Sequence, residues 1–224
     1  MIERILPPAV ASSHEYADVL DAELYPEELT VAARQSAPRR GAFTTGRHCA
    51  RRALHGLGVA AGPLPVGAAG EPLWPAGVAG AITHCDGYRA AAAARTTEVA
   101  SLGIDAEPHA PLSAGVLAAV ALPHERDQLR VLARARPALH WDKVLFSAKE
   151  SVYKAWFPLT GRWLDFAQAT VRFAPAGAPE VDAHTGRFSA RLLVAGPRIG
   201  HRRLSTLEGR WLVAAGLVMT AVTV

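Results

Sequence analysis

The chain has 224 residues, half of them hydrophobic, so it can bury about 70% of its unfolded surface in one domain or two small ones. The formal net charge of +4 favours anionic partners, but we find no helix-turn-helix, zinc-finger or RNA-recognition signature and expect no nucleic-acid partner. The C-terminal apolar run is too short to cross a bilayer, and the N-terminus has an acid and two prolines where a signal peptide needs a basic start, so we expect a cytoplasmic protein with no membrane partner.

The first half of the chain predicts helices followed by strands. In chain order it predicts a helix over 15–36, a basic turn over 36–41, a helix over 44–58, a Pro/Gly-rich loop over 60–77 and strands over 78–85, 88–94 and 99–107. Thr44 or Thr45 can cap the second helix and Gly56 or Gly58 can end it. Asp86 and Gly87 are suited to a turn between the first two strands.

The second half predicts three helices and then more strands. In chain order it predicts helices over 112–122, 125–136 and 141–157, strands over 169–173, 186–194 and 210–224, and turns at Ala176–Gly177 and His184–Gly186. Turns rather than crossover helices join most strands, so we expect mostly antiparallel sheets and an α+β fold. Residues 85–94 and 207–216 look faintly alike, which hints at an internal duplication.

Two carboxylates stand two positions apart at the end of the strand expected over 99–107. Asp105 and Glu107 point to one face because side chains alternate along a strand, and Pro108 ends that strand. Two like charges side by side repel each other and favour a positive group nearby. One interpretation is a solvated strand end, and the other is a hard divalent cation such as Mg²⁺, which binds carboxylate oxygens.

Lysine is confined to one short stretch of the chain. Of the 24 basic residues only Lys143, Lys149 and Lys154 are lysines, so a compact ammonium group occurs on the helix expected over 141–157 and nowhere else. Glu150 and Lys154 lie one turn apart on that helix and can act together. An ordinary surface ion pair is the alternative, since Glu followed by Lys at i+4 contributes about 0.2–0.5 kcal/mol.

Basic residues also crowd the start of the helix expected over 44–58. Arg47 is unfavourable near a helix N-terminus, whereas a phosphate held by its guanidinium and the free N–H groups would explain it. Solvated arginine side chains are the alternative. Thr83 and His84 end a strand beside a turn, where a structural histidine is the common case, and the chain lacks the C-x-x-C spacing of a zinc site.

Six motifs in order resemble the 4′-phosphopantetheinyl transferases, in the stand-alone class associated with surfactin and enterobactin synthetases and closest to its actinobacterial branch. They are GRHCARRAL, GEPLWP, AITHCDGYRAAAA, LGIDAE, FSAKESVYKAWFP and RWLDF. The resemblance implies two similar α+β halves in a pseudo-two-fold arrangement, residues 1–108 and 109–224, with the active site in the cleft between them. It also implies that the enzyme uses Mg²⁺ to move 4′-phosphopantetheine from coenzyme A to a serine of an apo acyl or peptidyl carrier protein, releasing 3′,5′-ADP.

The resemblance assigns roles by motif. Asp105, Glu107 and Glu150 match the metal-binding acids, and Asp105, Glu150 and Lys154 are the implied catalytic residues. Glu150 is also the implied general base, directly or through a metal-bound water, and Lys154 would stabilise the pyrophosphate and the leaving oxygen. The implied coenzyme A contacts are Arg39, Arg47, Val66, Gly70, Glu71, Thr83, His84, Lys149, Lys154 and Leu164.

The implied partners are apo carrier proteins of polyketide, fatty-acid or nonribosomal peptide synthases, siderophore pathways included, and we expect a monomer. Two departures from the family pattern stand out: residues 66–69 lack lysine, and Asp165 stands where glycine is common. The alternatives to this function are another Mg²⁺-dependent phosphoryl-transfer enzyme or phosphohydrolase, and a non-catalytic module that binds carrier proteins.

Overall fold

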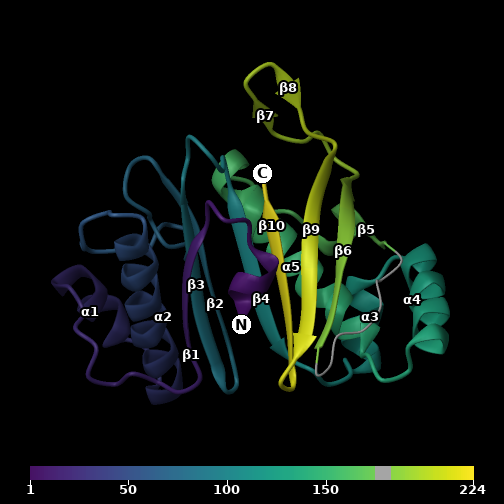
Figure 1. Ribbon diagram of the computed structural model, residues 1–224, viewed down its shortest axis with the longest axis horizontal. Helices are drawn as coiled ribbons and strands as arrows, with labels where there is room; N and C mark the ends of the chain where they lie inside the picture. Colours follow the sequence, from purple (N-terminus) through teal and green to yellow (C-terminus); the bar gives the residue numbers. More distant parts are fainter. Residues whose placement is uncertain (175–182) are drawn as a thin grey trace. The chain divides into compact units, whose positions relative to one another are not determined.

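The computed structural model describes residues 1–174 and 183–224, and these form two compact units. The first unit spans Met1–Leu102 and the second Gly103–Val224, and Figure 1 labels the elements of each. Both contain helices and antiparallel strand pairs, so the predicted α+β class is confirmed. The division at residue 108 and the pseudo-two-fold relation of the halves stay predictions.

The first unit builds a three-stranded sheet with one long helix packed against it. Its elements are η1 Ile2–Ile5, β1 Ala11–Glu15, α1 Pro26–Ala32, α2 Ala37–Gly56, β2 Val78–Cys85 and β3 Tyr88–Arg95. The strand order is β1-β3-β2, both pairs antiparallel. The alanines of residues 90–94 favour a helix by intrinsic propensity, yet all are fully buried in β3. Their small side chains let α2 approach, and Cys49, Ala53 and Ala93 share one buried cluster.

The helix predicted over 15–36 is wrong. Residues Ala11–Glu15 form a strand paired with β3, and only Pro26–Ala32 is helical in this region. Proline is accepted in the first turn of a helix but not in its interior, so Pro26 divides the segment. The turn at Asp86–Gly87 is confirmed, with Gly87 at a φ of 71°.

The start predicted for the second helix is also wrong. Helix α2 begins at Ala37, with Pro38 in its first turn, so residues 37–41 of the predicted basic turn are helical and neither predicted threonine caps the helix. The end predicted at Gly56 is confirmed. As a result Arg47 lies in the middle of α2, where the backbone N–H groups are engaged in helical hydrogen bonds and cannot bind a phosphate.

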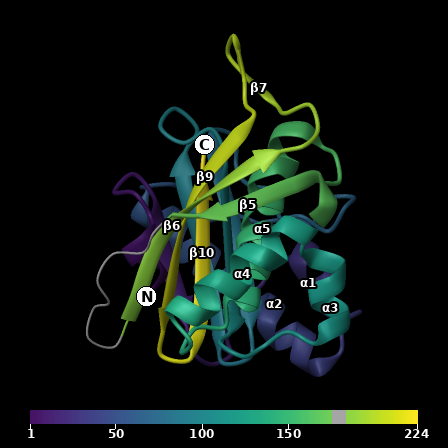
Figure 2. The same cartoon turned by 90° about the vertical axis from the view of Figure 1, so that its right-hand side faces the viewer.

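The second unit places helices against a five-stranded sheet. Its elements are β4 Leu102–Pro108, α3 Ala114–Val120, α4 Pro123–Ala135, α5 Trp141–Thr160, η2 Phe166–Gln168, β5 Ala169–Phe173, β6 Ala183–Leu192, β7 Arg198–Ile199, β8 Arg202–Arg203, β9 Thr206–Ala214 and β10 Leu217–Thr223. The sheet order is β4-β10-β9-β6-β5, and β7 and β8 form a separate hairpin. Figure 2 shows α3, α4 and α5 gathered on one face of the sheet.

Helix α5 is the central packing element of this unit. Its predicted apolar stripe, Leu145, Ala148, Val152 and Ala155, is fully buried, as expected from the helical spacing. The helix packs on β10 and ends at Gly161, whose left-handed conformation lets its N–H donate to the carbonyl oxygen of Phe157. A face of α5 is therefore held firmly against the sheet, and the residues beside that face have fixed positions.

The turn predicted at His184–Gly186 is wrong, because these residues belong to β6. A Cβ atom at Gly186 would lie 2.6 Å from the Trp211 ring of the neighbouring strand, so glycine makes room for an indole rather than for a turn. The turn predicted at Ala176–Gly177 lies outside the described residues. Within residues 1–174 and 183–224, no helix is long and apolar enough to cross a membrane.

Candidate active site

Strand β4 and helix α5 bring acids and lysines together in the second unit. The Lys154 ammonium lies 2.8 Å from Oδ1 of Asp105, and the Lys143 ammonium lies 3.1 Å from Oε2 of Glu107. Both carboxylates of the predicted pair thus point toward α5, as strand alternation predicts. The alternative of a fully solvated strand end does not hold, since Asp105 is buried and Glu107 is half-buried.

The spacing along α5 explains which lysines reach β4. Lys143 and Lys154 are 11 residues apart (154 minus 143), about three helical turns, so they lie on one side of the helix. Lys149 is six residues beyond Lys143 and points elsewhere. The close approach of the two elements depends on Gly103, where a Cβ atom would lie 2.0 Å from the Ser151 carbonyl oxygen.

Glu150 stands beside this group of charges. Burial and the nearby Asp105 carboxylate raise the pKa of Glu150 above its usual value, while Lys154 opposes the shift. Burial and Asp105 also raise the pKa of Glu107, against the lowering effect of Lys143 and Lys154. The three acids therefore repel one another, and an additional positive charge would be favourable there.

The residue chemistry fits a hard cation, although the acids are not gathered as a metal centre. Over residues 1–174 and 183–224, no three His, Cys, Asp or Glu side chains are grouped so that they could hold a metal ion. The positive charge next to Asp105 and Glu107 comes from lysine ammonium groups instead. Carboxylate oxygens are nevertheless the ligands that Mg²⁺ prefers, and their mutual repulsion would be relieved by it.

Lys149 occupies a different environment from Lys154. Its ammonium donates to Oε2 of Glu125 at 2.8 Å and to the carbonyl oxygens of Val120 and Phe166 at 3.0 and 2.8 Å. Three acceptors match its three N–H donors. Lys149 is 3% exposed and burial lowers its pKa, so a coenzyme A contact through this group stays a prediction that needs these bonds to open.

A pocket of about 130 Å³ opens beside Glu150. It is lined by Lys149, Glu150, Tyr153, Trp163, Leu164, Asp165, Phe166 and Ala169. The segment after α5 is fixed here because the indole N–H of Trp156 donates to the carbonyl oxygen of Arg162 at 2.8 Å. Leu164, predicted to touch the pantetheine arm, is thus on the wall of an apolar pocket that Glu150 also borders.

In the first unit, Arg47 is buried and bonded within the fold. Its guanidinium donates to the Leu64 carbonyl oxygen at 2.9 Å, lies 3.8 Å from the Glu28 carboxylate and stacks 4.4 Å from the centre of the Phe43 ring. Burial lowers the pKa of Arg47 to about 10. The alternative of a solvated arginine does not hold, and its predicted contact with a coenzyme A phosphate stays a prediction.

The other residues predicted to contact coenzyme A lie on helix, strand and loop positions of the first unit. Arg39 is exposed in the first turn of α2, and at the end of β2 Thr83 is buried while His84 is exposed. The loop with Val66, Gly70 and Glu71 forms a turn closed by a β-bridge between Val66 and Pro72. In this turn Gly70 has a φ of 89°, which glycine adopts without strain.

Three residues that organise these regions were not predicted from the sequence. Glu125 is completely buried, and its carboxylate accepts hydrogen bonds from the Lys149 ammonium and from the Val171 N–H. Glu28 is also completely buried and accepts hydrogen bonds from Arg51 and the Leu64 N–H. Lys143 belongs to the lysine cluster but was given no role. Its spacing of three turns from Lys154 was the available signal, whereas nothing local marks either glutamate as buried.

Comparison with known proteins identifies the family. The pattern of the 4′-phosphopantetheinyl transferase N-terminal domain matches residues 26–94, and that of the 4′-phosphopantetheinyl transferase superfamily matches residues 101–205.

Two relatives cover nearly the whole chain. The 4′-phosphopantetheinyl transferase Svp of Streptomyces mobaraensis is 51% identical over 227 residues, covering 100% of this chain and 89% of the relative. The 4′-phosphopantetheinyl transferase PptT of Mycobacterium tuberculosis is 47% identical over 234 residues, covering 99% of this chain and 97% of the relative. The chain therefore belongs to the 4′-phosphopantetheinyl transferase superfamily, as the order of its motifs predicts.

Proposed function

We propose that the reaction of this transferase takes place where β4 meets α5, with Glu150 as the general base. The chain is an enzyme that transfers 4′-phosphopantetheine to carrier proteins, with coenzyme A as the donor. The observation that carries the assignment is the position of Glu150. It borders the pocket of Trp163 and Leu164 and lies within electrostatic reach of Asp105 and Lys154.

In the proposed reaction the serine hydroxyl of the apo carrier attacks the β-phosphorus of coenzyme A. A new P–O bond forms to the serine, the bond from that phosphorus to the bridging oxygen breaks, and 3′,5′-ADP leaves with the electron pair. The serine proton passes to Oε of Glu150. A raised pKa makes Glu150 a stronger base at neutral pH than an exposed glutamate, which supports this role.

Asp105, Glu107 and Glu150 are the residues that would hold Mg²⁺. When bound, Mg²⁺ supplies neutralisation of the charge that grows on the pyrophosphate oxygens. Lys154 is proposed to donate to the same oxygens, and it can turn from Asp105 because its side chain is partly exposed. Lys143 holds Glu107 and keeps that carboxylate on the α5 side of β4.

The first unit is proposed to bind the rest of coenzyme A. Arg39, Arg47, His84 and the adjacent Thr83 would hold its phosphates, and the loop of residues 66–71 would pass along the adenine. The pocket lined by Leu164 and the buried Lys149 would receive the pantetheine arm. We further propose a cytoplasmic monomer that serves acyl and peptidyl carrier proteins of fatty-acid, polyketide or nonribosomal peptide synthases.

Intact-mass spectrometry of apo carrier proteins tests this proposal. With Mg²⁺ and coenzyme A, the wild-type protein is expected to add one phosphopantetheine to an apo carrier, and a carrier with alanine at the acceptor serine is expected to stay unmodified. Chelation of Mg²⁺ should stop the reaction. Release of phosphate from coenzyme A without modification of several apo carriers would instead indicate a phosphohydrolase.

A further inference from the structure

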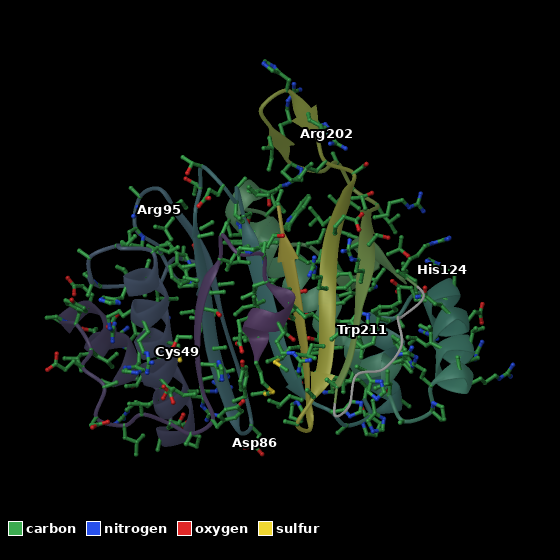
Figure 3. The ribbon with its side chains drawn as sticks, viewed as in Figure 1. Cys49, Asp86, Arg95, His124, Arg202 and Trp211 are labelled. Carbon is green, nitrogen blue, oxygen red and sulfur yellow. The ribbon has the colours of Figure 1, made fainter. Side chains whose placement is uncertain are left out.

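The hairpin formed by β7 and β8 is strongly basic. Residues Arg198–Arg203, which we call the basic hairpin, include three arginines and His201, all exposed. From Ala183 to Leu207 the sequence contains five arginines and no acidic residue. Figure 3 shows Arg202 on this hairpin. The basic hairpin therefore presents a concentrated positive charge to solvent.

The pairing of the two strands places two of these positive charges against each other. Arg198 lies directly opposite Arg203 in the antiparallel register. Like charges directly opposite each other across a strand pair are destabilising, and an anionic group from outside would remove that repulsion. Arg203 is engaged at the base of the hairpin, where its guanidinium donates to the Gly196 carbonyl oxygen at 3.2 Å. This base is closely packed, since a Cβ atom at Gly196 would lie only 1.8 Å from the Leu204 carbonyl oxygen.

The base of the hairpin is joined to the segment that borders the Glu150 pocket. Arg162 donates to the Ala195 carbonyl oxygen at 2.8 Å, and it directly precedes Trp163 and Leu164, which line that pocket. The Leu193 N–H also donates to the Gln168 carbonyl oxygen at 2.8 Å. The basic hairpin is therefore bonded at its base to the segment that forms the pocket wall.

Exposed apolar side chains lie on the segments that are bonded to each other at the base of the hairpin. Trp163 is 71% exposed and Leu193 is 46% exposed. Arginine and tryptophan are enriched where proteins bind proteins, and tryptophan is among the residues that contribute most to such binding. The phosphate backbone of a nucleic acid would bind the arginines but make no favourable contact with Leu193. This surface therefore favours a protein partner that carries carboxylates.

We propose that the basic hairpin docks an acidic face of the carrier protein beside the Glu150 pocket. This inference rests on the proposed function, because the carrier is the protein that must present its serine there. Opposite charges on two partners speed their encounter and fix their relative orientation. Arg198 and Arg202 bind carboxylates of the carrier, and the exposed Trp163 and Leu193 contact its apolar side chains.

The double variant Arg198→Glu/Arg202→Glu tests the docking. Arg198→Glu places a carboxylate opposite Arg203, which favours the hairpin, so unfolding would not explain a loss of binding. The variant Arg34→Glu/Arg134→Glu changes the net charge equally at other exposed positions and serves as the matched control. With an apo acyl carrier protein of strongly negative net charge, we expect the KM for the carrier to rise about tenfold in the hairpin variant only.

The kcat and the KM for coenzyme A should stay within about twofold of wild type, and the difference in carrier KM should shrink as salt screens the charges. Equal carrier KM values for the hairpin and control variants would overturn the docking. Binding of single-stranded DNA that the hairpin variant loses, with an unchanged carrier KM, would overturn it in favour of nucleic acid.

If the wild-type protein modified no carrier, the proposed function would fail separately. Calorimetric binding of the same apo carrier to the wild type and the hairpin variant would then decide the docking alone. Weaker binding by the hairpin variant than by the control would support it, and equal binding would contradict it.

Discussion

Helix α5 carries two lysines that make similar ion pairs in different surroundings. Lys149 lies 2.8 Å from Glu125 and Lys154 lies 2.8 Å from Asp105. The Lys149 side chain is 2% exposed and has two further carbonyl acceptors, whereas the Lys154 side chain is 27% exposed. The same pair of charges can therefore support the fold in one place and remain available to a substrate in another.

Burial decides the energetic difference between the two pairs. Removing one partner of a buried ion pair costs about 3–5 kcal/mol, because the other charge is left uncompensated in a region of low dielectric constant. An exposed pair contributes about 0–1 kcal/mol. Lys154 is intermediate, since water reaches the ammonium group but Asp105 is buried. Loss of Lys149 should thus affect mainly stability, and loss of Lys154 mainly the reaction.

The largest effect is expected from Glu150→Gln, which keeps the shape of the side chain and removes the base. We expect the transfer rate to fall by about 10²–10⁴-fold, measured by the appearance of holo carrier under single-turnover conditions. Glu208→Gln, at an exposed position of β9, is the control and should react at the wild-type rate. A Glu150→Gln rate within about threefold of wild type would remove Glu150 from the role of base.

The same variant should be at least as stable as the wild type at neutral pH. Burial and Asp105 raise the pKa of Glu150 in the folded protein, so the folded protein binds this proton more tightly than the unfolded chain does. The free energy of unfolding therefore falls as pH rises from the usual value of 4.5 through the raised pKa, and Gln removes that loss. Thermal unfolding at several pH values checks the sign.

A smaller effect is expected from Gly103→Ala, which tests the contact between β4 and α5. The added Cβ atom would meet the Ser151 carbonyl oxygen, and relief of the overlap must move β4 or α5 at a cost of about 1–3 kcal/mol. Asp105 would move with β4, so the transfer rate should fall as well. In Gly115→Ala the new Cβ atom meets nothing within 4 Å, so this control should keep both stability and rate.

The smallest effect is expected from Lys143→Met. Lys143 lowers the pKa of Glu107, which burial and Asp105 raise, so its removal raises that pKa further. Because the ionised Glu107 is the form proposed to act, the rate should begin to fall at a higher pH as the solution is acidified. Lys143→Arg keeps the charge and should keep the wild-type pH profile. Identical profiles for the Met variant and the wild type would show that Lys143 does not control Glu107.

The sequence predicted those parts of the fold that local patterns determine. The α5 stripe follows from helical spacing, and the common direction of Asp105 and Glu107 follows from strand alternation. The errors arose where packing overrides a local pattern. Gly186 is typical of a turn, but it lies in a strand because only glycine leaves room for the Trp211 ring beside it. The segment 15–36 carries a helical pattern, but Glu15 pairs with β3 and the helix begins only at Pro26.

The candidate site was predictable in its residue types but not in its pairings. Three lysines on one helix indicated a special role, yet nothing in the sequence shows that Lys149 meets Glu125 while Lys154 meets Asp105. Those contacts join residues 24 and 49 positions apart in the chain. Arg47 is a similar case, because only the fold shows its bonds to Leu64 and Glu28.

Matched replacement of the two lysines tests the central claim most directly. Lys149→Met and Lys154→Met should be compared by the free energy of unfolding in urea and by the single-turnover transfer rate of the folded protein. We predict that Lys149→Met loses about 3–5 kcal/mol of stability and that Lys154→Met loses less than half as much. At saturating coenzyme A, Lys154→Met should in turn lose at least tenfold in rate, with the rate of folded Lys149→Met within about threefold of wild type, because loss of a coenzyme A contact would raise the KM for coenzyme A instead. A stable Lys149→Met protein that transfers poorly, beside a fully active Lys154→Met protein, would contradict the account.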